Sequence, residues 1–123
     1  VMIGYVLMGT NDLARAASFY DALVGEMGGR RKLELERSIL WGRDKGAAIF
    51  GVITPFDGKA ATPGNGFTLA LRVDSHAAVD TLHAKALALG ATDDGAPGAR
   101  GTGKFYGAYF RDLDGNKVVL YHA

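Results

Sequence analysis

Cysteine is absent from the 123 residues. Disulfides, thiolate zinc sites and a cysteine nucleophile are therefore excluded, and the fold needs no oxidising compartment. Also lacking are an apolar run long enough to cross a bilayer and the charged, apolar and small-residue pattern of a signal peptide at the start of the sequence. We therefore expect a cytoplasmic protein.

An excess of charge of either sign is lacking too. The chain has 14 lysines and arginines against 13 acidic residues, for a formal net charge of +1, and the two signs are interspersed. Such a surface carries no electrostatic footprint for nucleic acid or an anionic membrane, so we expect neither partner. The length and an apolar content of 48% suffice for a single domain with its own core.

What the sequence does contain is a repeat of pattern. Sliding the chain by 63 residues lays residues 3–28 over residues 66–91 without a gap. Each copy begins with an apolar run, 5–8 and 68–71, which is typical of a buried strand. Each run leads to a helix start, capped by Asn11 or Asp12 in the first copy and by Asp74 or Ser75 in the second.

Further strands are expected after each helix. In the first copy they cover residues 33–35, 38–41 and 48–54, and in the second they cover 104–111 and 117–122. The last two should be joined by a hairpin turn at Asp112 to Asn116, because Asp-Gly between alternating apolar residues is a strong hairpin signal. We predict one α+β domain over residues 1–123, with a first module at 2–54, a linker at 55–65 and a second module at 66–123.

Four stretches carry a family resemblance: Gly9 to Tyr20, Pro55 to Gly58, Gly64 to Gly66, and Tyr106 to Lys117. With two βαβββ modules in this length, the chain resembles the vicinal oxygen chelate superfamily, also called the glyoxalase/bleomycin resistance/dioxygenase group. The resemblance implies paired modules whose strands form a curled mixed sheet, with the helices on its outer face. It also implies a cleft for a small molecule and a homodimer.

Metal ligands in this superfamily come from the first and last strand of each module. The corresponding residues here are Tyr5, Phe50, Thr68 and Val119. None is a histidine, glutamate or glutamine, and a divalent ion needs oxygen or nitrogen donors around it. We therefore expect no metal and no other cofactor.

The remaining side chains of the predicted cleft are aromatic and polar. Tyrosine and arginine among apolar neighbours suit a site that stacks an organic ring and pairs with an anion, although tyrosines in sheets commonly pack across strands and arginines are commonly solvated. The candidate ligand-binding residues are Tyr5, Phe50, Thr68, Arg72, Tyr109, Arg111, Val119 and Tyr121.

Two other features could take part in a site. His76 and His83 are seven residues apart on one helix, roughly 10 Å along its axis, so one ion cannot bridge them. The glycine-rich segment 95–103 lacks the residues of a phosphate-binding loop and is expected to be a flexible loop. Alternatively, it forms a lid that brings Arg100 or Lys104 to an anionic ligand.

A superfamily does not fix a reaction. The lack of metal donors favours a protein that binds a small aromatic or anionic molecule without a metal. The alternative is an enzyme similar to lactoylglutathione lyase, or an isomerase, in which a tyrosine or an acid such as Asp57, Asp93 or Asp94 transfers protons. A structural dimer without a ligand is a third interpretation.

Overall fold

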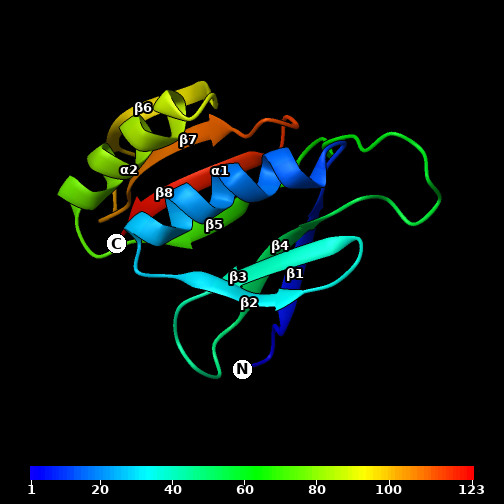
Figure 1. Ribbon diagram of the computed structural model, residues 1–123. Coiled ribbons are helices and arrows are strands. Elements are labelled where there is room, and N and C mark those ends of the chain that lie inside the picture. Colours follow the sequence, from blue (N-terminus) through cyan, green and yellow to red (C-terminus); the bar gives the residue numbers. More distant parts are fainter. The chain divides into compact units, whose positions relative to one another are not determined.

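The computed structural model describes all 123 residues. The chain divides into two compact units, Val1–Pro63 and Gly64–Ala123 (Figure 1). Each unit contains a strand, a helix and three more strands, and the eight strands form two hydrogen-bonded sheets of four. The predicted α+β class and the two βαβββ modules are thus confirmed.

The first unit consists of β1 (Tyr5–Gly9), α1 (Leu13–Glu26), β2 (Arg30–Glu34), β3 (Ser38–Gly42) and β4 (Ile49–Ile53). Its sheet has the order β1-β4-β3-β2. The β1–β4 pair is parallel, and the pairs β3–β4 and β2–β3 are antiparallel. A parallel pair needs a long crossover, which α1 and the β2–β3 hairpin supply.

The second unit consists of β5 (Leu69–Arg72), α2 (His76–Ala88), β6 (Thr92–Ala99), β7 (Tyr106–Arg111) and β8 (Lys117–His122). Its sheet repeats the arrangement of the first in the order β5-β8-β7-β6, with β5 parallel to β8. Neither helix of the protein is long and apolar enough to cross a membrane.

The structure decides between the alternative helix caps. The side chain of Asp12 accepts a hydrogen bond from the Arg15 backbone N–H at 3.1 Å, and Ser75 accepts one from Ala78 at 3.0 Å. These bonds satisfy amides that have no partner inside the helix. Each helix is followed by a glycine with positive φ, Gly28 at 79° and Gly90 at 108°.

The glycine-rich segment is only partly a loop. Residues 95–99 belong to β6, which pairs antiparallel with β7. The expectation of a flexible loop over 95–103 was therefore wrong for its first half. The sequence TDDGAPGA shows no apolar alternation, and its ladder to β7 shifts register twice, between Asp93 and Gly95 and between Gly95 and Gly98. Such irregularity is typical of an edge strand, whose pairing partner compensates for poor strand propensity.

The predicted hairpin turn between β7 and β8 is confirmed. Asp112 and Asn116 are buried, and the Asp112 carboxylate accepts hydrogen bonds from the backbone N–H groups of Asp114 and Asn116, both at 2.9 Å. Gly115 has a φ of 86°, which favours glycine. The Asp112 side chain therefore organises the turn.

An ion pair at the surface of the first unit gives a pH prediction. Arg31 donates to both carboxylate oxygens of Asp21, at 2.9 and 2.7 Å, and these bonds lower the pKa of Asp21 below its ordinary 3.8 against the opposing effect of burial. The Trp41 indole N–H adds a bond of 2.9 Å to the same carboxylate. Asp21 therefore binds a proton at higher pH in the unfolded chain than in the folded one. The contribution of Asp21 to the free energy of unfolding is complete above pH 3.8 and is lost as the pH falls through the pKa of Asp21 in the folded protein.

We expect wild type to lose more stability than Asp21→Asn when the pH is lowered from neutral to below 3.8. The Asp21 side chain is 42% exposed, so the difference should not exceed about 1 kcal/mol. Urea unfolding at each pH measures it. Parallel pH profiles for the two proteins would show that Asp21 titrates alike in the folded and unfolded chains.

Candidate functional site

The sheet of the first unit has two unlike faces. Phe50 and Trp41, which are paired across β3 and β4, lie with Tyr20 of α1 in one ring cluster. The alternate residues of the same strands point to the other face, because side chains alternate along a strand. That face has no helix of this unit on it and holds the candidate site.

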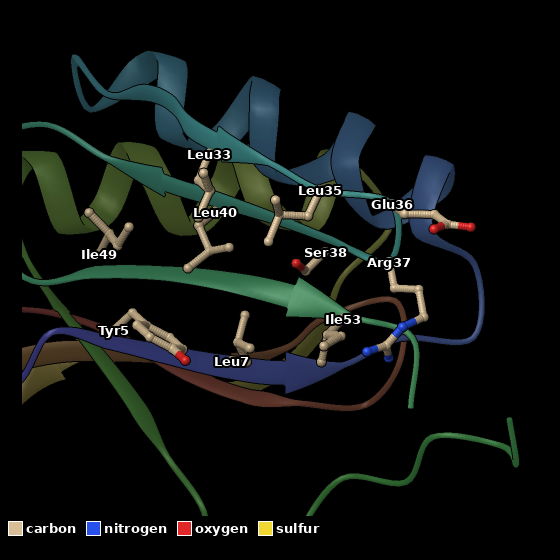
Figure 2. Close-up of a pocket in the computed structure, with 10 residues that line it drawn as sticks. All are labelled: Tyr5, Leu7, Leu33, Leu35, Glu36, Arg37, Ser38, Leu40, Ile49 and Ile53. Carbon is tan, nitrogen blue, oxygen red and sulfur yellow. The ribbon is translucent and has the colours of Figure 1, made fainter. Parts of the chain in front are cut away.

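A pocket of about 420 Å³ lies on this helix-free face (Figure 2). Its walls are mainly aliphatic side chains from all four strands and the β2–β3 turn, and Figure 2 shows them projecting to the same side. Its size and apolar character are those of a small-molecule site. The lining residues are Tyr5, Leu7, Leu33, Leu35, Glu36, Arg37, Ser38, Leu40, Ile49 and Ile53.

The sequence builds the floor of this pocket by strand alternation. Leu7, Gly51 and Leu40 lie side by side on β1, β4 and β3, since Leu7 pairs with Gly51 and Gly51 pairs with Leu40. Gly51 contributes no side chain, and Leu40 packs into the space that a side chain there would occupy. Ile49 and Ile53, two residues away on either side, belong to the same face.

Polar groups lie around the apolar floor. Tyr5 is 63% exposed, so its hydroxyl is open to a ligand. Arg37 comes from the β2–β3 turn and donates to the Thr54 carbonyl oxygen at 2.8 Å. Glu36 is the only carboxylate on the pocket, and Figure 2 shows its side chain extending away from the aliphatic ones.

Phe50 is not on this face, which corrects the sequence-based assignment. It is only 8% exposed, and its ring centre lies 5.5 Å from that of Tyr20 and 6.0 Å from that of Trp41. The parallel register places Phe50 opposite Val6 instead of Tyr5 or Leu7, and so on the helix side. The face position of β4 is Gly51, which offers a metal no donor either.

The candidates in the second unit share a face of its sheet. Val119 pairs with Tyr109 and with Ala70, and Arg72 pairs with Tyr121. Directly paired residues point to the same side, as predicted. Thr68 immediately precedes β5, and Arg111 is on β7 two residues after Tyr109.

Several of these side chains already have partners within the unit. Arg111 bonds to Asp94 at 3.1 Å, and Tyr121 stacks on Phe105 with ring centres 5.2 Å apart. The Tyr109 ring lies between two cations: its centre is 5.1 Å from Lys117 Nζ and 5.8 Å from the guanidinium carbon of Arg100. Arg100, which follows β6, also donates to the Ala96 carbonyl oxygen of that strand at 2.6 Å.

The acids considered for proton transfer are engaged elsewhere. Asp57 accepts the Lys59 backbone N–H at 2.9 Å in a turn. Asp93 bonds to the buried His83 at 3.2 Å, and Asp94 binds Arg111. None of the three lines the pocket of the first unit.

The donor set does not fit a metal ion. No group of three or more histidine, aspartate and glutamate side chains is placed to hold one. His83 Nε2 lies 3.2 Å from the Tyr109 carbonyl oxygen, His122 Nδ1 donates to the Val73 carbonyl oxygen at 2.7 Å, and His76 stacks on Tyr106. The four ligand positions expected from the resemblance hold a phenol, a hydroxyl and two hydrocarbon side chains. Gly51, which takes the place of Phe50 on the pocket face, has no side chain to bind a metal.

Of the candidate residues from the sequence, only Tyr5 lines this pocket. Sequence reasoning missed the residues of the β2–β3 hairpin, above all Leu35 and Arg37. A signal that could have found them is the spacing of two residues between Leu33 and Leu35 and between Ser38 and Leu40. This spacing puts each pair on one face of its strand.

Two βαβββ units, with an apolar pocket on the helix-free face of the first sheet, define the class of the protein. A model of the Glyoxalase/Bleomycin resistance protein/Dioxygenase superfamily matches residues 2–120. The chain therefore belongs to this superfamily. No curated protein matches the sequence.

Solved structures agree with this assignment. A glyoxalase/bleomycin resistance protein from Albidiferax ferrireducens T118 is 36% identical and has a TM-score of 0.87, with 100% of this chain and 99% of that chain covered. A glyoxalase/bleomycin resistance protein/dioxygenase family enzyme from Burkholderia phytofirmans PsJN is 25% identical, with a TM-score of 0.75 and coverage of 97% and 96%. A lactoylglutathione lyase from Agrobacterium tumefaciens shares the fold at 20% identity, with a TM-score of 0.72 and coverage of 98% and 92%.

Proposed function

We propose that the protein binds a small organic molecule against the helix-free face of its first sheet, without a metal ion. The observation that carries the proposal is the pocket of about 420 Å³ with aliphatic walls and the polar groups of Tyr5, Arg37 and Ser38 at its edges. Burial of a ligand there removes apolar surface from water, at roughly 0.8 kcal/mol for each buried methylene. The polar groups orient the ligand.

Binding without a metal is supported by the chemistry of the lining residues. The pocket contains no histidine, and its one carboxylate extends away from the aliphatic walls (Figure 2). A divalent ion would find no set of oxygen and nitrogen donors there. The same observation argues against a lyase or isomerase that follows metal-centred chemistry. Likeness to the Agrobacterium enzyme concerns the fold alone, and no contact in the pocket favours the catalytic alternative.

A thermal-shift screen of aromatic and aliphatic acids and alcohols tests the proposal. We expect a ligand from this set to raise the Tm by mass action, equally in the presence and absence of a chelator. Leu35→Gln should lower the affinity for that ligand about tenfold, because it replaces an apolar side chain of the pocket wall with a polar one. Leu35 is 57% exposed, so the substitution should leave the fold intact.

Met2→Gln is the matched control, since Met2 is 97% exposed and lines no part of the pocket. A ligand whose effect disappears on chelation would contradict binding without a metal. A ligand that binds Leu35→Gln as tightly as wild type would contradict this location. The homodimer implied by the family resemblance stays a prediction, which light scattering after size-exclusion chromatography checks.

A further inference from the structure

A second hollow adjoins the apolar pocket of the first unit. It has a volume of about 380 Å³ and lies where β1 and β4 end, walled by the segment that follows β4. Arg37 lines both hollows, so they meet at this side chain. The residues around the second hollow include Thr10, Asn11, Arg37, Thr54, Phe56 and Lys59.

The second hollow differs from the first in charge. Two of its lining residues, Arg37 and Lys59, are cations, and none is acidic. The nearest acids in sequence are used elsewhere, because Asp57 accepts a backbone N–H in its own turn and Asp12 caps α1. The hydroxyl of Thr10 and the amide of Asn11 are hydrogen-bonded to Asp12 and Ala61, so the two cations are the groups that face a ligand with charge.

Arg37 is held in place between the two hollows. Its backbone carbonyl accepts the Thr54 N–H at 3.0 Å, and its side chain donates to the Thr54 carbonyl oxygen at 2.8 Å. The Phe56 ring lies below the guanidinium, with 5.4 Å from its centre to the guanidinium carbon. A guanidinium has five N–H donors in a planar fork, so one bond to Thr54 leaves the others for a ligand.

Neither Arg37 nor Lys59 forms an ion pair with a carboxylate, in contrast to three arginines of the chain. Arg31 is paired with Asp21, Arg43 with Asp44 and Arg111 with Asp94. The acids nearest Arg37 in sequence are Glu34 and Glu36. Glu34 is paired with Arg31 at 2.8 Å, and Figure 2 shows the Glu36 side chain extending away from the aliphatic ones. An anionic group placed between Arg37 and Lys59 would therefore meet two positive charges that form no ion pair, with the Asp57 carboxylate held at the Lys59 backbone N–H.

We propose that both hollows hold one ligand, an elongated amphipathic anion. Its hydrocarbon body lies on the aliphatic floor beside Leu35 and Leu40, and its carboxylate or phosphate group is bound by Arg37 and Lys59. The inference rests on the proposed function, because the first hollow must accept the body of the ligand. It adds the chemical class of the ligand and the two residues that select for charge. Hydrogen bonds from cations to an anion are about twice as strong as neutral ones.

The experiment compares ligands that differ only in the head group: octanoate, octyl phosphate and octanol, titrated by calorimetry below their micelle concentrations. We expect wild type to bind at least one of the anions about tenfold more tightly than octanol, with the difference shrinking as salt is added. Arg37→Gln and Lys59→Gln should each reduce the affinity for that anion by more than they change the affinity for octanol. The anion that binds more tightly identifies the head group.

Lys45→Gln is the matched control, since it removes the same charge from a turn that lines neither hollow. Arg37→Gln loses its bond to Thr54, so circular dichroism must confirm that it folds, and the exposed Lys59 supplies a second test if it does not. Equal binding of octanol and both anions by wild type would overturn this inference and leave the proposed function standing. Absence of binding for all three ligands would overturn this inference, and the thermal-shift screen with aromatic acids and alcohols would then decide the proposed function.

Discussion

Replacing Trp41 with alanine is expected to lower the free energy of unfolding by about 3–5 kcal/mol. Trp41 is completely buried, and its ring contacts those of Tyr20 and Phe50 at centre distances of 5.5 and 6.0 Å. Its indole N–H donates to Asp21 at 2.9 Å, so the substitution also leaves that carboxylate with one bond fewer. Domains of this size are typically stable by about 5–15 kcal/mol, so the substitution removes a large share of the total.

Urea unfolding followed by circular dichroism measures this loss, because Trp41 is the only tryptophan and its fluorescence is lost with it. Trp41→Phe keeps a ring in the cluster but loses the hydrogen bond, and should cost less than the alanine variant. Phe56→Ala, at a residue that is 91% exposed, should change stability by no more than about 0.5 kcal/mol. A loss below about 1 kcal/mol for Trp41→Ala would show that the ring cluster does not hold α1 to the sheet.

The repeated pattern of the sequence, together with the family resemblance, was sufficient to predict the two modules. Helical spacing and capping residues are local signals that agree in both copies, and the Asp-Gly turn adds a third in the second copy. The strand β6 was missed because its local signal is poor: Gly95, Pro97 and Gly98 interrupt any alternation. Its strand conformation comes from pairing with β7, which residues 92–99 do not themselves encode.

The candidate site was less predictable, for a reason that Phe50 makes clear. Alternation separates the residues of a strand into two faces, but only the pairing register decides which face meets the helix. A shift of one residue between β1 and β4 exchanges Phe50 for Gly51 on the pocket face. Arg37 and Lys59 escaped notice because they lie in a turn and a loop, where no period identifies a shared location.

The packing of β3 against β4 and the pocket floor beside Leu40 both depend on the absence of a side chain at Gly51. We expect Gly51→Ala to destabilise the protein by about 3 kcal/mol, the upper end of the range for overpacking. An added Cβ would lie 2.6 Å from Leu40 Cγ and 2.8 Å from Leu40 Cα, and would also collide with the Ile39 carbonyl oxygen. The backbone of β3 cannot yield without breaking its ladder to β4, so the clash is costly.

Gly4→Ala is the control for this substitution, because a Cβ at Gly4 would meet nothing within 4 Å. Both variants restrict the unfolded chain alike, and that effect alone favours the folded state by about 0.4–1 kcal/mol. The difference between their urea unfolding free energies therefore isolates the contact with β3. If Gly51→Ala folds with wild-type stability, β3 must move away from β4 at this point, and the pocket floor beside Leu40 would widen. A stable Gly51→Ala with unchanged ligand affinity would contradict the close approach of the two strands.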